Sequence, residues 1–277
     1  MKRIFHARPA AAFFGIAVLV LGALLPAAAQ ERRGIAPLNS DSPLTELITG
    51  REFSPVEARA LQDDDFDNPG FAWVTRGEAS WRLAEGSAGK SCSACHGISG
   101  DAMRGWAAEY PKFHAGERKV VNLEQRINLC RRDKMGAEPW PLDSAEMLGM
   151  AAFLGVQSRG VVMNVRIDGP AKAAFGAGEK LHTQRMGQLG MSCAGCHDRH
   201  VGKSHDGRTI NQGHANGFPA YRISDQSFGS LDRQLTACFE RMKAEPFAPG
   251  SDEYVALQLY LAWRGAGLPM QIPSVRR

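Results

Sequence analysis

The pattern of apolar and polar residues changes sharply near the start of the chain. Residues 13–25 are almost entirely apolar, basic residues precede them, and Ala27, Ala28 and Ala29 follow. A basic start, a short apolar core and an Ala-x-Ala site are typical of a secretory signal peptide. Because the apolar stretch is short for a bilayer span, we expect residues 1–29 to be removed rather than retained as an anchor. No later stretch is apolar enough to span a membrane, so we expect a protein exported to the periplasm.

Helical periodicity recurs in the rest of the chain and twice ends on a cysteine. Two segments place apolar residues and a cysteine at i, i+4 and i+7: Leu123, Ile127 and Cys130, and Leu231, Leu235 and Cys238. This spacing predicts two helices, each with its cysteine on the inward face. An Ala-Glu-Pro sequence follows both cysteines at nearly the same distance. The same plan therefore occurs twice in the chain, which indicates an internal duplication.

A further apolar helix is predicted after each of these segments. Asp143 and Glu146 form a capping box that opens "AEMLGMAAFLGV", and "DEYVALQLYLAW" is its counterpart in the second half. Residues 161–172 lose the helical period and contain Gly-Pro, which is typical of a linker. Signals for strands are weak, so the fold class is mainly α. The extension at residues 30–75 contains "LQDDDFDNPGF", whose acidic composition predicts a solvated surface loop.

Charge gives little indication of a partner. The formal net charge of +4 falls to +1 once Lys2, Arg3 and Arg8 leave with the signal peptide. A nearly neutral chain gives no reason to expect binding to nucleic acid. Export to an oxidising compartment makes the placement of the six cysteines the main chemical question.

Four of the cysteines lie in two copies of the same motif. The sequences "CSACH", from Cys92 to His96, and "CAGCH", from Cys193 to His197, are both C-x-x-C-H. This motif attaches c-type haem through Cys92, Cys95, Cys193 and Cys196, and the adjacent His96 and His197 supply the proximal iron ligands. Two alternatives are a zinc site made from both cysteine pairs and two thioredoxin-like redox motifs. A zinc site does not need the histidine, and the βαβ context of a redox motif is missing, so we favour a dihaem cytochrome c.

The sixth position on each haem iron has several candidate ligands. Methionine is the usual choice, and four methionines stand at suitable distances: Met135, Met147, Met150 and Met242. Only Cys130 and Cys238 recur in register, so we expect cysteine to be the distal ligand in both halves. A disulfide between these two residues is the alternative that export permits.

Together these residues resemble a known family. The sequence is similar to the SoxA family, the dihaem A subunits of the periplasmic SoxAX cytochrome of thiosulfate oxidation. The similarity rests on the two C-x-x-C-H motifs and on "LQDDDFDNPGFAWVTRGEASW", "VNLEQRINLCR", "MGAEPWPLDSAEMLGMAAFL", "FPAYRISDQSFGSL" and "CFERMKAEPFAPGSDEY". It implies two cytochrome c-like domains, at residues 76–160 and 173–277, after the extension at residues 30–75.

The resemblance also implies an activity and partners. Members of the family join thiosulfate oxidatively to a cysteine of the SoxYZ carrier protein, as L-cysteine S-thiosulfotransferases. They work as a heterodimer with a monohaem SoxX subunit and pass electrons to a downstream cytochrome c. His96 with Cys130, and His197 with Cys238, would be the axial ligands of two covalently bound haems. Cys238 would also be the catalytic residue, with an extra sulfur as a cysteine persulfide.

One position departs from the family's pattern. The resemblance implies an arginine four residues before the catalytic cysteine, where it would hold the thiosulfate dianion, and this chain has Gln234. The first half has Arg126 at the corresponding place before Cys130. Candidate replacement cations, in order of preference, are Arg241, Arg233, Arg222 and Lys243. The change keeps two other functions open: an electron-transfer cytochrome without thiosulfate chemistry, and a thiosulfate dehydrogenase that forms tetrathionate.

Overall fold

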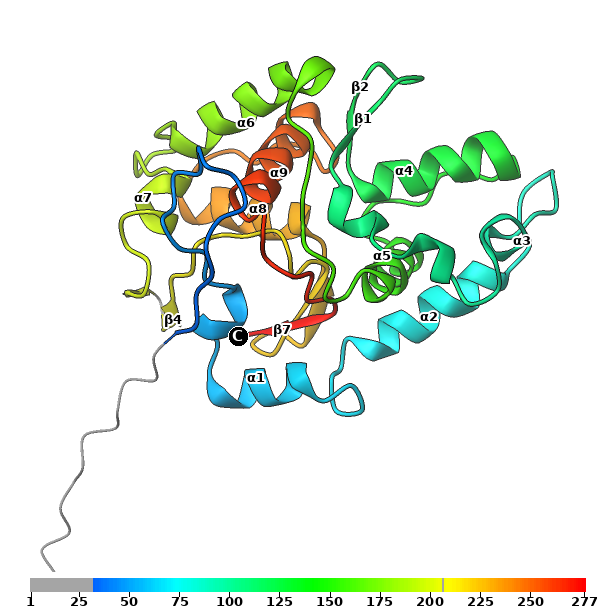
Figure 1. Ribbon diagram of the computed structural model, residues 1–277, viewed down its shortest axis with the longest axis horizontal. Helices are drawn as coiled ribbons and strands as arrows, with labels where there is room; N and C mark the ends of the chain where they lie inside the picture. Colours follow the sequence, from blue (N-terminus) through cyan, green and yellow to red (C-terminus); the bar gives the residue numbers. More distant parts are fainter. Residues whose placement is uncertain (1–31, 206) are drawn as a thin grey trace, which may run out of the picture. The chain divides into compact units, whose positions relative to one another are not determined.

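The structure is a computed structural model that describes residues 32–205 and 207–277, so the predicted signal peptide lies outside it. Helices dominate the described residues, as the periodicity predicted (Figure 1). Two elements of the described chain precede the first half: the 3-10 helix η1 (Gly50–Phe53) and the α-helix α1 (Val56–Asp63). The first half contains these elements: α2 (Phe71–Arg82), α3 (Cys92–His96), η2 (Asp101–Met103), η3 (Trp106–Glu109), β1 (Lys112–His114), β2 (Lys119–Val121), α4 (Leu123–Cys130), η4 (Arg131–Met135) and α5 (Ala145–Gln157).

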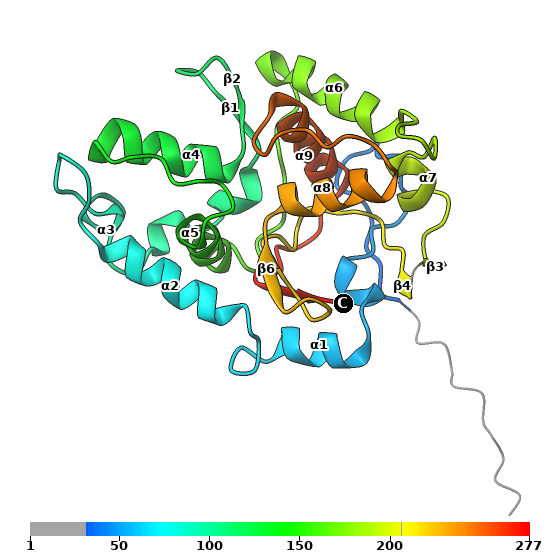
Figure 2. The same cartoon turned by 180° about the vertical axis from the view of Figure 1, so that it is seen from behind.

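The second half repeats the order of the four α-helices and of the hairpin before the third of them. It contains η5 (Gly169–Ala171), α6 (Lys172–Thr183), α7 (Cys193–His197), β3 (Ser204–His205), β4 (Arg208–Thr209), β5 (Ala220–Arg222), β6 (Ser227–Gly229), α8 (Leu231–Arg241), α9 (Asp252–Arg264) and β7 (Ser274–Arg276). In both halves the C-x-x-C-H motif forms a short helix of its own, and a later helix carries the single cysteine. Figures 1 and 2 show α3 and α7 on opposite sides of the described chain.

The longest helices of each half cross at small residues. In the first half, α2 meets α5 where Gly77 faces Gly149, and a Cβ at Gly77 would lie 2.0 Å from the Gly149 carbonyl oxygen. In the second half, α6 meets α9 where Gly178 faces Ala256 at the same distance. Only glycine permits such a close approach of two backbones. These crossings set the distance between each pair of helices and so the width of each half's core.

Two β-hairpins precede the cysteine-bearing helices, and the sequence patterns did not predict them. Strand β1 pairs with β2 from Lys112↔Val121, and β5 pairs with β6 from Ala220↔Gly229. Strand β7, at the chain's end, joins β5 in parallel. Strands of three residues are too short for an alternating pattern to be recognised. Each hairpin lies directly before α4 or α8 in the chain.

The start of α5 differs from the prediction by one residue. Ser144, not Asp143, is the N-cap, and its hydroxyl accepts a hydrogen bond from the Met147 amide. Asp143 instead accepts a 2.6 Å hydrogen bond from Ser230 in the other half. The predicted capping box was therefore wrong, because the aspartate has a tertiary partner that no local pattern reveals.

The acidic segment of the extension makes contacts with the rest of the protein that its composition did not predict. Asp65 lies 2.7 Å from the guanidinium of Arg159, and the buried Asn68 donates to the Pro273 carbonyl at 3.0 Å. Phe66 does project into solvent, with 95% of its surface exposed. The segment is thus anchored at both sides of an exposed tip, and the prediction of a wholly solvated loop was wrong.

The residues between the halves pack against both of them. Residues 161–168 form no helix, yet Met163 is buried and Asn164 donates to the Ala108 carbonyl at 3.0 Å. The largest group of buried apolar residues joins Val120 from the first half to Leu259 from the second. No described helix is both long enough and apolar enough to cross a membrane.

Candidate functional site

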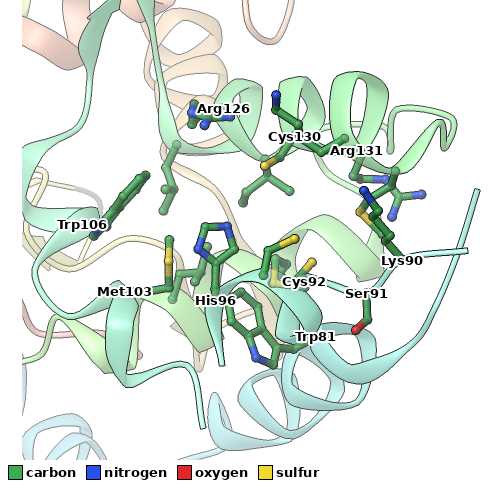
Figure 3. Close-up of a pocket in the computed structure, with 17 residues that line it drawn as sticks. Trp81, Lys90, Ser91, Cys92, His96, Met103, Trp106, Arg126, Cys130 and Arg131 are labelled. Atoms are coloured by element: carbon green, nitrogen blue, oxygen red, sulfur yellow. The ribbon is translucent and has the colours of Figure 1, made fainter. Parts of the chain in front are cut away.

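The first C-x-x-C-H motif opens onto an apolar pocket (Figure 3). Ser91 caps α3 by accepting a hydrogen bond from the Ala94 amide at 3.1 Å, which holds the short helix in place. Figure 3 shows the His96 ring on one side of the pocket and the Cys130 thiol on the opposite side. Apolar side chains fill most of the wall between them: Trp81, Met103, Trp106, Leu123, Ile127, Met135, Met150 and Leu154.

Aromatic contacts surround His96. The Trp81 ring lies 5.8 Å from the imidazole, and its indole N–H donates to the Gly97 carbonyl at 2.8 Å. Trp106 approaches from another direction, edge to face, at 6.4 Å. These contacts hold the histidine toward the pocket. A mainly apolar pocket with two cysteines, a histidine and an opposing cysteine fits a porphyrin attached by its vinyl groups.

The second motif places His197 directly against Cys238. Ser192 caps α7 by accepting from the Gly195 amide at 3.1 Å. The Nδ1 of His197 lies 2.7 Å from the Asn211 carbonyl, so it carries the proton and donates there. That bond leaves Nε2 for the contact with Cys238, to which the imidazole is hydrogen-bonded. A backbone carbonyl on the far nitrogen is the usual arrangement for a histidine that ligates a metal.

The pKa values of the paired cysteines argue against redox-active thiolates. Burial raises the pKa of Cys92 to about 11 and that of Cys193 to about 12. Reactive C-x-x-C motifs need the opposite, a thiol pKa lowered by neighbouring positive charge or a helix terminus. The thioredoxin-like alternative is therefore contradicted by the environment of both motifs.

His197 and Cys238 stabilise each other's charged form. Burial is the largest effect on the pKa of His197 and would lower it, but the hydrogen bond to Cys238, the charge of that residue and the hydrogen bond to the Asn211 carbonyl together raise the pKa above its ordinary value. Burial is likewise the largest effect on the pKa of Cys238 and would raise it, yet the hydrogen bond and charge of His197, together with Gln234 and Arg241, bring the pKa below the ordinary thiol value. The sulfur of Cys238 is thus disposed toward the thiolate, the form that binds iron.

Neither a disulfide nor a zinc site finds support in the structure. All six cysteines are unpaired, so Cys130 and Cys238 form no disulfide. Within the described ranges there is no group of three or more His, Cys, Asp or Glu residues that could hold a metal ion such as zinc. Of the four candidate methionines, Met147 and Met242 are buried in the apolar cores, whereas Met135 and Met150 line the pocket between His96 and Cys130.

Three of the candidate cations stand in different relations to Cys238. Arg241 approaches the sulfur directly, with Nη1 at 3.8 Å. Arg233 instead donates to the Phe228 carbonyl at 3.3 Å. Arg222 reaches the sulfur through Gln234, which accepts from Arg222 at 3.0 Å and donates to Sγ at 3.3 Å. The structure therefore brings Arg241 and Arg222 to the site and directs Arg233 to the hairpin backbone.

A buried charged network beside the second motif was not predicted from the sequence. Arg264 lies 2.7 Å from the carboxylate of Asp198, the residue after His197, and 3.2 Å from Nε2 of His182. Burial lowers the pKa of His182, so it is neutral and accepts from the guanidinium. In the first half Trp81 stands at the same distance before its cysteine pair. Comparing the two halves in register would have revealed the difference.

Together, the helices that carry C-x-x-C-H and the opposing cysteines define a c-type cytochrome with two halves of the same plan. The sequence model of the SoxA/TsdA cytochrome c domain family matches residues 76–163 and again residues 177–270. The chain belongs to this family, whose fold class of two cytochrome c-like segments was predicted correctly. Its haem is therefore of the covalently attached c type.

Curated relatives carry a single description. The chain is 38% identical over 244 residues to the L-cysteine S-thiosulfotransferase subunit SoxA of Rhodovulum sulfidophilum, which covers 88% of this chain and 85% of the relative. It is 38% identical over 230 residues to the subunit of the same name from Paracoccus pantotrophus, covering 83% and 79%. The crystal structure of SoxXA from P. pantotrophus superposes with a TM-score of 0.83 at 36% identity, covering 89% of this chain and 93% of that one.

Proposed function

We propose that this protein is the haem-carrying A subunit of an L-cysteine S-thiosulfotransferase and holds one haem in each half. The observation that carries the proposal is the same arrangement built twice, a C-x-x-C-H helix whose histidine faces a cysteine from a later helix. Covalent attachment is assigned to Cys92, Cys95, Cys193 and Cys196. Axial ligation is assigned to His96 with Cys130 and to His197 with Cys238.

The proposal includes three protein partners. The superposed crystal structure is a SoxXA complex, which supports a monohaem SoxX-like subunit as the heterodimer partner. A SoxYZ-like carrier supplies the acceptor cysteine, and a downstream cytochrome c removes the electrons. The signal-peptide pattern at residues 1–29 supports a periplasmic location, which the covalent haem also requires.

The reaction joins thiosulfate to the carrier thiol. One S–S bond forms, the carrier thiol releases one proton, and two electrons leave, so that R–SH and S₂O₃²⁻ give R–S–S₂O₃⁻, H⁺ and two electrons. Bound haem supplies the acceptor for those electrons. The protein's own contribution is to hold the reacting sulfur atoms together and to stabilise their negative charge.

Cys238 is the residue we assign to the reacting position, with its additional sulfur as a persulfide. Its sulfur accepts hydrogen bonds from His197 and Gln234, and Arg241 lies 3.8 Å away. Donors and a cation around one sulfur favour its anionic form and the approach of an anion. The first site differs, because Arg126 stands there at the place of Gln234 and the pocket around Cys130 is mainly apolar.

The proposal is tested with protein matured in a periplasm that attaches haem. Intact mass and a pyridine haemochrome spectrum are expected to show two haems per chain and the loss of residues 1–29. With the SoxX-like subunit, a SoxYZ-like carrier and thiosulfate, we expect haem reduction and a carrier heavier by one thiosulfate group. A carrier of unchanged mass, or tetrathionate formed without any carrier, would contradict the proposal.

A further inference from the structure

The hairpin and helix that hold each single cysteine are copies of one unit. Residues 111–130 align with residues 219–238 without a gap: the two strands of one hairpin fall on those of the other, and Cys130 falls on Cys238. Every position of the first copy therefore has one counterpart in the second. Differences between counterparts show where the second site has its own chemistry.

The charge on the helix differs between the copies. In the first copy Arg126, one turn before the cysteine, is hydrogen-bonded to Tyr110. The counterpart of Arg126 is Gln234, and the counterpart of Tyr110 is Phe218, which offers no hydroxyl group. The second copy has lost both the helix cation and its phenolic partner.

The hairpin of the second copy carries the cation instead. Where the first hairpin ends strand β1 with His114, the second ends β5 with Arg222. The Arg222 guanidinium donates to the Gln234 side-chain oxygen at 3.0 Å, and the Gln234 side-chain nitrogen donates to the Cys238 sulfur at 3.3 Å. Two hydrogen bonds thus connect the guanidinium to the sulfur, and the amide is fixed with its N–H on the sulfur side.

The surroundings of Arg222 favour an anion. Its side chain is only 17% exposed, and its Nε forms an ion pair with the Asp225 carboxylate at 3.6 Å, while Nη1 bonds to Gln234. Burial lowers the pKa of Arg222, and the nearby guanidinium groups of Arg208, Arg233 and Arg241 lower it further, against the opposite effect of Asp225.

A small pocket opens at this point. Its wall combines guanidinium, hydroxyl and amide groups: Arg222, Arg233, Arg276, Ser227, Ser230 and Gln234. Donors of this kind suit the oxygen atoms of a small oxyanion.

We infer that Arg222 and Gln234 act as one anion-holding unit beside Cys238, with the charge on the hairpin and the orienting amide on the helix. The inference rests on the proposed function and names the residue that replaces the helix cation. The ligand class is a small sulfur oxyanion, whose oxygen atoms face Arg222 while its terminal sulfur faces Cys238. Arg222 is a binding residue in this scheme, and Gln234 positions it.

The test compares binding and turnover in matched variants of the haem-loaded complex. Arg222→Gln removes the charge but keeps a hydrogen-bonding side chain, so the Kd for thiosulfate, measured by calorimetry, should rise about 10- to 100-fold, the size expected for one buried charge-assisted contact. The KM should rise with it, while the haem absorption spectrum stays unchanged. Arg166→Gln removes an exposed charge that pairs with Asp168 and should leave both constants unchanged.

A second variant separates binding from folding. In the Arg222→Gln background, Gln234→Arg returns the cation to the place it has in the first half, and we expect it to recover most of the lost affinity. If Arg222→Gln binds thiosulfate as tightly as the parent protein, or if the double variant shows no recovery, the inference is wrong. If the parent binds thiosulfate through Arg222 but transfers nothing to the carrier, the inference stands and the proposed function is wrong.

Discussion

The crossing of α6 and α9 provides the sharpest structural prediction. A Cβ at Gly178 would lie 2.0 Å from the Ala256 carbonyl oxygen, 2.6 Å from its carbon and 3.0 Å from the Tyr260 Cβ. Backbone atoms cannot rotate away, so Gly178→Ala must push the two helices apart by more than about 1 Å before ordinary contact is restored. A Cβ at Gly176, two residues earlier in the same helix, would meet no neighbouring group within 4 Å, so Gly176→Ala is a matched control.

The two substitutions, Gly178→Ala and Gly176→Ala, should change the free energy of unfolding in opposite directions. Overpacking a well-packed contact costs about 1 to 3 kcal/mol, and the backbone clash places Gly178→Ala at the upper end. The higher helix propensity of alanine returns up to about 1 kcal/mol. Gly178→Ala should therefore lower the free energy of unfolding by about 2 kcal/mol, which corresponds to a Tm about 4 to 8 °C lower in a chain of this size. Gly176→Ala should raise the free energy of unfolding by about 0.5 to 1 kcal/mol.

Thermal and urea unfolding of the haem-loaded protein, followed by far-ultraviolet circular dichroism, measures both changes. Gly77→Ala repeats the experiment at the crossing of α2 and α5, where the backbone approach is equally close. If Gly178→Ala and Gly176→Ala stabilise the protein equally, the two helices are not in backbone contact and the reasoning fails.

Three further results are expected. Burial raises the pKa of Glu124 to about 7, so the protonated side chain contributes fully to stability below its ordinary pKa, and this contribution is lost as the pH rises through 7. In urea unfolding, the free energy of unfolding of Glu124→Gln should equal that of the parent near pH 4 and exceed it by about 2 to 3 kcal/mol at pH 8. Equal free energies of unfolding at both pH values would contradict this. Phe228 is 2% exposed and stacks on Trp73 with ring centroids 5.2 Å apart, so it joins the two halves. In urea unfolding, Phe228→Ala should lower the free energy of unfolding by about 3 kcal/mol. A decrease below about 1 kcal/mol would show that the contact is not well packed. Cys238→Ala should abolish transfer to the carrier while mass spectrometry still finds two haems per chain; retained transfer would exclude Cys238 as the reacting residue.

Local sequence was sufficient for the parts of this protein that short-range contacts decide. The C-x-x-C-H segments form single helical turns, and the stripes ending at Cys130 and Cys238 form α4 and α8, because residues three and four apart meet on one helix face. The position of Gln234 one turn before Cys238 also follows from this spacing, and the structure confirms their contact. Duplication was visible for the same reason, since both halves repeat the local pattern.

Contacts between distant segments decided the rest. Asp143 leaves the helix start to accept from Ser230, and Arg222 reaches Gln234 from a hairpin whose strands are too short to leave a pattern. The network of Arg264 with Asp198 and His182 likewise joins α9 to residues 66 and 82 positions earlier in the sequence. Which charged group meets which partner depends on how helices and hairpins pack, and packing is set by the shapes of buried surfaces, such as the glycine crossings, that periodicity along the chain does not encode.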